Sequence, residues 1–198
     1  MTMTAQLPQA ARSVQAASHW LKRYYFTRFA FCAAWVALAF AIAKNLPLLA
    51  AIMLVGYPAW DAIANFVDAQ RSGGLRRNRA QLLNFLVSII TAIAVAVALR
   101  HSMNGMLIVF GMWAAFSGIL QLATAVGRWK TAGAQWAMIL SGAQSALAAA
   151  FMIRMAQGLE PVGILSIAPY AAFGAFYFLV AAVSLAVSDA RKSRHSAA

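Results

Sequence analysis

Polar side chains that could carry acid–base chemistry lie inside an apolar stretch of this 198-residue chain. Asp61, Asn65 and Asp68 follow one another at spacings of four and three residues within GYPAWDAIANFVDAQ (56–70). In a helix, these side chains share one face. A carboxylate inside an apolar helix is costly unless it faces protein or a cavity and has a partner. The first question is therefore which elements position Asp61 and which cation neutralises it.

The composition indicates that those elements are membrane-spanning helices. The chain is 63% hydrophobic and 10% charged, with a mean hydropathy of +0.72, whereas soluble domains have roughly 45–50% apolar and about 25% charged residues. The apolar runs are continuous, without the alternation of barrel strands, and about 20 residues suffice to cross a bilayer. We predict an all-α membrane protein with six spans, at about 26–43, 46–66, 81–99, 104–126, 136–155 and 162–187.

The basic residues predict the orientation of these spans. One side carries Arg12, Lys22, Arg23, Arg28, Arg71, Arg76, Arg77, Arg79, Arg128, Lys130, Arg191, Lys192 and Arg194. The other side carries Lys44, Arg100 and Arg154. This bias predicts cytoplasmic termini and a multi-pass protein of the bacterial inner membrane. It also assigns the net charge of +12 to topology and to anionic lipid at the cytoplasmic face, which excludes nucleic acid as a partner.

The predicted domains are a basic cytoplasmic or interfacial tail (1–25), a transmembrane domain (26–188) and a basic cytoplasmic tail (189–198). Residues 10–24 place apolar side chains at helical spacing. They fit either a short interfacial helix, with Trp20 and Tyr24 at headgroup level, or a disordered basic tail.

An internal repeat divides the transmembrane domain. The odd-numbered spans end on Lys44, Arg100 and Arg154, and AAFSGILQLATAV (114–126) shares six of thirteen positions with AAFGAFYFLVAAV (171–183). We predict three tandem helical hairpins, at about 26–70, 81–127 and 136–187.

The hairpin geometry then supplies a partner for Asp61. With a turn near Lys44, Arg28 lies at about the depth of Asp61, and Asn84 and Ser117 occupy the corresponding positions of the second hairpin. Two interpretations stay open: an ion pair or solvated carboxylate that serves structure alone, or a polar site between hairpins with Asp61 as its protonatable group. The candidate site comprises Asp61, Arg28, Asn65, Asn84, Ser117 and Gln121.

Other chemistry is not indicated. Cys32 is the only cysteine, the three histidines lie far apart, and no nucleotide-binding, hydrolase or zinc motif occurs. Asp61 also lacks a second carboxylate deep in the spans with which to share acid–base work. We therefore expect no catalytic residues, no metal, no cofactor and no enzymatic activity.

Two segments carry a resemblance to a known family. WAAFSGILQLATAVGRWK (113–130) and QWAMILSGAQSALA (135–148), with the hairpin repeat, resemble the HdeD-like family of bacterial inner-membrane proteins, best over residues 80–190. The resemblance implies a six-helix protein with a role in resistance to acid stress, although the basic N-terminal tail and Asp61 depart from the family pattern. Two functions follow: a non-enzymatic protein of the envelope stress response, or a small transporter or channel built around Asp61. The sequence leaves a homo-oligomer open.

Overall fold

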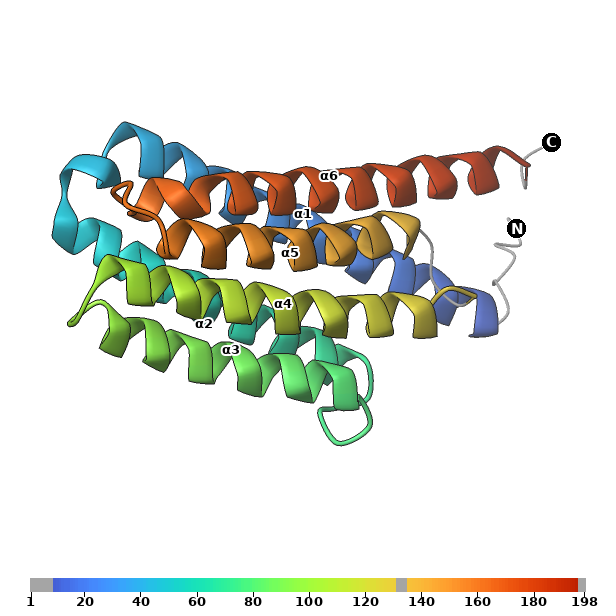
Figure 1. Cartoon of the computed structure of the whole chain (residues 1–198). Helices are drawn as coiled ribbons and strands as arrows, with labels where there is room; N and C mark the ends of the chain where they lie inside the picture. The colour runs from blue at the N-terminus through green and yellow to red at the C-terminus, as the bar shows by residue number, and fades with distance from the viewer. Residues whose placement is uncertain (1–8, 131–134, 196–198) are drawn as a thin grey trace, which may run out of the picture.

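The chain forms a bundle of six long helices. The computed structural model describes residues 9–130 and 135–195. The helices, which lie side by side (Figure 1), are α1 (Gln9–Ala41), α2 (Pro47–Arg71), α3 (Arg79–Ala98), α4 (Met103–Gly127), α5 (Gln135–Ala156) and α6 (Ile164–His195). A short 3-10 turn, η1 (Ala43–Asn45), joins α1 to α2, and the described residues contain no strand. Each of the six helices contains a stretch that is long and apolar enough to cross a membrane. The predicted all-α, six-span fold is confirmed.

Successive helices run in opposite directions, so the connections gather at two ends of the bundle. The start of α1, the end of α6, the ends of α2 and α4 and the starts of α3 and α5 lie at one end, here named the terminal end (Figure 1). Lys44, Arg100 and Arg154 lie at the opposite end, here named the loop end, as the positions of these residues in the sequence predicted.

Local turn chemistry explains where several helices begin and end. Pro47 starts α2, where its missing N–H costs nothing. The same helix stops at Gly73 and Gly74, whose φ angles of 97° and 92° favour glycine, and the Gly74 amide donates to the Ala69 carbonyl at 2.8 Å. Ser102 caps α4, because its hydroxyl accepts a hydrogen bond from the Gly105 amide at 3.0 Å.

Two helices are longer than a bilayer requires. α1 has 33 residues and α6 has 32, which gives about 50 Å each against a hydrocarbon core of about 30 Å. Their extra turns project at the terminal end (Figure 1), where Ser18 and Lys22 both donate to the Asp189 carboxylate.

The segment predicted as an N-terminal tail is therefore largely helix. Residues 9–25 continue into the first span without a break, because they contain no glycine or proline and because α1 packs against α6. The predicted C-terminal tail is helical through His195. Residues 1–8 and 196–198 of the two predicted tails lie outside the described residues.

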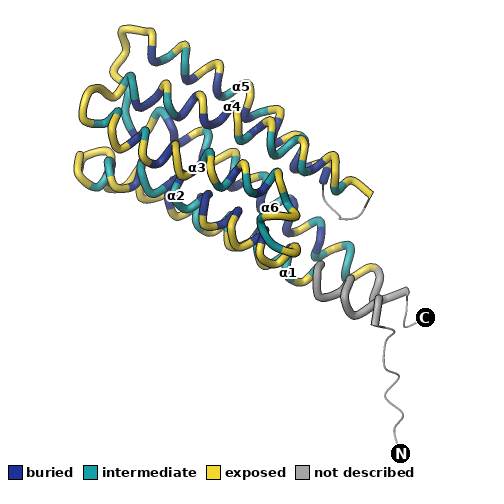
Figure 2. Tube along the Cα trace, turned by 90° about the horizontal axis from the view of Figure 1, so that it is seen from below, coloured by how far each residue is buried: buried dark blue, intermediate teal, exposed yellow. Residues whose placement is uncertain are grey.

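The closest packing joins neighbouring hairpins and not the two helices of one hairpin. α4 packs most closely against α5, α1 against α6 and α2 against α3, whereas α1 and α2 scarcely touch. Glycines explain the first contact: a Cβ atom on Gly118 would lie 2.7 Å from the Gly142 carbonyl oxygen, and one on Gly111 would lie 2.9 Å from Ile153 Cγ1. Small residues let helix backbones approach in lipid. Burial accordingly follows the inward faces of the helices (Figure 2).

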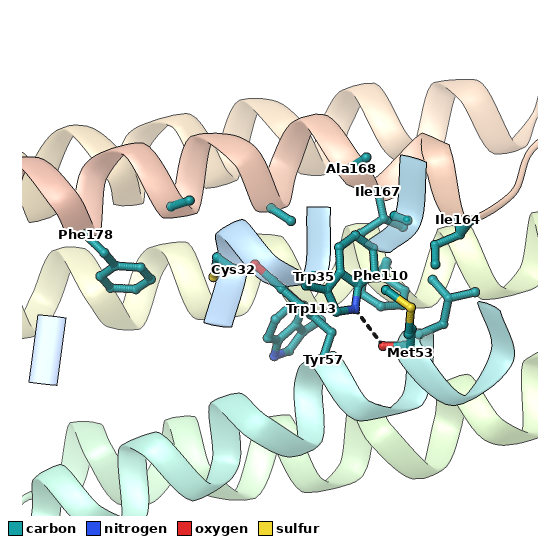
Figure 3. Packing of buried hydrophobic residues seen from close by; sticks show 14 of the residues in the cluster. Cys32, Trp35, Met53, Tyr57, Phe110, Trp113, Ile164, Ile167, Ala168 and Phe178 are labelled. Atoms are coloured by element: carbon teal, nitrogen blue, oxygen red, sulfur yellow. Dashed lines mark hydrogen bonds between the residues drawn. The ribbon is translucent and has the colours of Figure 1, made fainter. Parts of the chain in front are cut away.

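An apolar layer closes the half of the bundle toward the loop end. Each helix supplies one buried member, and aromatic rings from several helices meet around Tyr57 and Trp113 (Figure 3). The Trp35 indole also donates to the backbone oxygen of Met53 at 2.9 Å, in the turn before Pro58. The apolar layer consists of Trp35, Leu54, Val95, Phe110, Met152 and Ile167.

The glycine contact makes a direct prediction. Gly118→Ala forces a methyl group against backbone of α5 and should destabilise the fold by about 1–3 kcal/mol. A lower thermal unfolding midpoint of the purified protein in detergent is the expected readout.

Gly56→Ala is the matched control, because nothing lies within 4 Å of a Cβ atom added at that helical position. Alanine is the better helix former by about 1 kcal/mol, so this variant should be as stable as the wild type or more so. Equal loss in the two variants would contradict the close approach of α4 and α5.

Candidate functional site

The Asp61 carboxylate forms an ion pair with Arg28 across the seam between α1 and α2. Arg28 Nη2 donates to Asp61 Oδ1, and the exposed fractions of the two side chains are only 14% and 11%. Arg28 Nη1 donates to the Tyr24 hydroxyl at 3.0 Å, and the guanidinium carbon lies 4.4 Å from the ring centroid of Phe178. A cation over an aromatic face gains electrostatic stabilisation. The predicted pairing of Arg28 with Asp61 is therefore present, supported by one further residue on α1 and one on α6.

Three donors share the Asp61 carboxylate. Besides Arg28, Asn65 Nδ2 and Ser88 Oγ each donate to Asp61 Oδ2 at 2.8 Å. The Trp113 indole in turn donates to Ser88 Oγ at 3.1 Å. The network therefore links α1, α2, α3 and α4 at one depth. A buried charge is tolerated when it is paired and its remaining lone pairs are satisfied in this way.

A polar cavity lies beside this network. Its volume is about 80 Å³, enough for a few water molecules. Two of its polar atoms, Asn84 Oδ1 and Ser117 Oγ, are buried without a hydrogen-bond partner among the described residues. The six predicted site residues all line it: Arg28, Asp61, Asn65, Asn84, Ser117 and Gln121. The structure thus brings together residues from four helices that the repeat placed at similar depth.

A second, smaller cavity of about 50 Å³ continues toward α5 and α6. It shares Arg28, Asp61, Ser117 and Gln121 with the first cavity. Its other polar side chains include Ser141 and Gln144 of α5 and Tyr170 of α6. Polar groups from all six helices therefore meet in the half of the bundle toward the terminal end.

A second carboxylate is paired nearer the terminal end. Asp68 Oδ2 accepts hydrogen bonds from Gln81 Nε2 at 3.1 Å and from Arg128 Nη2 at 3.2 Å, so α2, α3 and α4 are joined again. Both Asp68 and Arg128 line the first cavity. Both carboxylates that line the cavity, Asp61 and Asp68, are therefore paired with arginines.

Sequence reasoning missed three members of these networks: Gln81, Ser88 and Trp113. Gln81 and Ser88 belong, with the predicted Asn84 and with Thr91, to a row of buried polar residues on α3 spaced by three or four positions. That spacing marks a polar stripe on one helix face, and it was visible in the sequence. Trp113 gave no such signal, because its indole donor becomes relevant only when Ser88 lies opposite.

No metal centre is indicated by the described residues, which contain no group of three His, Cys, Asp or Glu side chains that could hold a metal ion. Cys32 is buried and free, with its sulfur 3.5 Å from the Tyr57 hydroxyl. Its surroundings are those of a core residue.

Comparison with known proteins adds one family relationship. Residues 86–154 match the family described as a short repeat of unknown function (DUF308). This is the domain of HdeD-type proteins, and the match spans most of α3, all of α4 and most of α5. It covers about a third of the chain, within the region that carries the sequence resemblance. No curated protein and no solved structure matches the chain.

The buried ion pair predicts a strong energetic coupling. Arg28→Gln and Asp61→Asn should each destabilise the protein by about 3–5 kcal/mol, because each leaves one buried charge unpaired. The double variant removes both charges and should lose much less than the sum. Thermal unfolding of the three variants in detergent measures the coupling energy between the two residues. If the loss of stability in the double variant equals the sum of the two single losses, the two side chains are not coupled.

Lys22 and Asp189 form the control pair. Their side chains are 21% and 30% exposed, so Lys22→Gln and Asp189→Asn should each cost only about 0–1 kcal/mol. A loss as large as that of the Arg28 and Asp61 variants would mean that burial is not what makes the central pair important.

Proposed function

We propose that this multi-pass membrane protein is a non-catalytic, HdeD-type protein of the bacterial inner membrane that acts in the envelope response to acid stress. The observation that carries the proposal is the state of Asp61. Its carboxylate, the candidate for acid–base chemistry that the sequence indicated, is engaged by Arg28, Asn65 and Ser88. The other buried carboxylate of the cavity, Asp68, is engaged by Gln81 and Arg128. Such a group fastens helices together and is poorly placed to react with a substrate.

The apolar layer supports a body that does not conduct. None of its six members lines either polar cavity, and their exposed fractions are between 0 and 4%. A permeating ion or polar solute would have to cross this layer without hydrogen-bond partners, at high cost. The DUF308 match over residues 86–154 supports the family assignment and hence the stress role.

A small transporter or channel is the second candidate. The unpartnered Asn84 and Ser117 oxygens beside the Arg28–Asp61 pair favour it, because they offer free hydrogen-bonding positions inside a polar cavity. Transport through this cavity would require the apolar layer to open.

Proteoliposomes distinguish the two candidates. We expect wild-type protein to leave proton leak, followed with an entrapped pH-sensitive dye, and solute-dependent swelling at the levels of protein-free vesicles. Robust flux that is lost in Asp61→Asn would replace our proposal by the second candidate.

A strain that lacks the gene provides the complementary measurement. We expect poorer survival of this strain at low external pH, with rescue by the wild-type gene and by Gly56→Ala. If the deletion strain survives as well as the parent strain, the proposed role in acid stress is wrong.

The proposed orientation has a separate test. The excess of basic residues at the terminal end supports a cytoplasmic position for that end. In a Cys32→Ala background, Leu159→Cys, at a fully exposed position of the loop end, should react with a membrane-impermeant maleimide in intact spheroplasts. Ser72→Cys at the terminal end should react only after lysis, and the reverse pattern would invert the topology.

A further inference from the structure

A groove separates α1 from α2 at the terminal end. It has a volume of about 500 Å³, within the range of ligand sites. It exists because α1 and α2 contact each other far less than each contacts its other neighbour. Large rings hold the two helices apart at its base, where Phe31 and Trp60 stack with centroids 4.5 Å apart. The exposed side chains of Arg23, Thr27 and Ile63 show that the groove opens to the outside of the bundle.

The mouth of the groove is positively charged. His19, Arg23 and Arg71 line it, and neither arginine forms a salt bridge among the described residues. Arg71 instead lies over the Trp20 ring, with its guanidinium carbon 5.0 Å from the centroid. Elsewhere at this end, Lys22 and Arg128 are each paired with an aspartate. The groove therefore offers uncompensated positive charge to an anion.

Two buried donors lie along the same groove. The indole nitrogens of Trp20 and Trp60 are buried and have no hydrogen-bond partner among the described residues, and both residues line the groove. Buried polar groups in proteins normally find an acceptor. Because both nitrogens are covered by protein atoms, a ligand in the groove would contact the indole rings and not these N–H groups.

The lower wall of the groove is apolar. Ile63, Ala64 and Val67 of α2 form it, and Ile63 and Val67 are exposed to the surroundings of the bundle. From His19 to Arg28 the groove follows α1 for about 14 Å, at about 1.5 Å per residue. That is roughly half of a hydrocarbon core of about 30 Å, so the groove is about as long as the hydrocarbon part of one leaflet is deep.

We propose that this groove binds an anionic glycerophospholipid of the leaflet at the terminal end. The headgroup phosphate sits between Arg23 and Arg71, because guanidinium groups bind phosphate oxygens in a bidentate manner. The Trp20 ring lies at this level, beside Arg71, and one acyl chain lies along Val67 and Ile63 toward the Trp60 ring. A zwitterionic lipid has the same chains but brings its own cation to the mouth.

The position of Arg28 connects this lipid to the central network. Arg28 lines both the groove and the polar cavity, and its Nε is buried without a partner among the described residues. A lipid in the groove therefore covers the outer side of the residue that neutralises Asp61. Arg28 therefore forms part of the wall between the groove and the polar cavity.

Native mass spectrometry of the full chain, released from detergent micelles with added lipid, tests the proposal. We expect one phosphatidylglycerol to bind in preference to phosphatidylethanolamine or phosphatidylcholine. Arg23→Gln combined with Arg71→Gln should weaken this binding about tenfold or more, given the usual contribution of basic residues to anionic-lipid binding. Ile63→Trp, which fills the acyl-chain path without changing charge, should weaken it as well.

Two controls match these variants. Arg76→Gln combined with Arg77→Gln removes the same charge from the connection between α2 and α3, and Ile93→Trp adds the same ring to an exposed position of α3; both should bind phosphatidylglycerol as the wild type does. Equal losses in the charge variants and their control would overturn the proposal, as would binding of inorganic phosphate as tight as that of the lipid. A dimer that disappears in Ile63→Trp, with lipid binding unchanged, would also overturn it by assigning the groove to a second copy of the chain.

Discussion

The burial of an ionised carboxylate at membrane depth is the constraint on which the central part of this structure depends. Asp61 cannot face lipid, so α2 must turn that face toward cations and donors on other helices. Arg28 of α1 and Ser88 of α3 meet it there, Asn65 of α2 itself adds a third donor, and Trp113 extends the network to α4. One charge thereby joins four helices through direct and shared hydrogen bonds. Nonspecific apolar packing would leave the same helices freer to slide.

A second constraint acts between the hairpins. Lipid tails are as apolar as the helices, so close fit and hydrogen bonds must hold the bundle together. Gly118 and Gly142 let α4 and α5 approach until a methyl group would no longer fit. The seam between α1 and α2 is wide instead, because the stacked rings of Phe31 and Trp60 lie between these helices. The same bundle thus has a tight seam that confers rigidity and an open seam that leaves a groove at the membrane.

The two halves of the bundle differ in the polarity of their interior. Toward the loop end, every helix contributes a buried apolar side chain to one layer. Toward the terminal end, polar groups from every helix surround two small cavities. The interior is therefore polar in the half toward the terminal end and apolar in the half toward the loop end. A polar solute in the two cavities would find no continuous polar path through the bundle. This division underlies our preference for a non-conducting role.

The sequence by itself determined the class, the number of spans, their alternating direction and the partner of Asp61. These follow from the length of apolar runs, the placement of Lys44, Arg100 and Arg154, and the cost of an unpaired charge in lipid, all of which act locally or through depth alone. Tertiary structure alone decided which helices pack most closely, that Ser88 and Trp113 join the Asp61 network, and that α1 and α2 leave a groove. Depth fixes one coordinate of each residue, but the rotation of a helix and the choice of its neighbours depend on side chains from distant parts of the chain meeting in space.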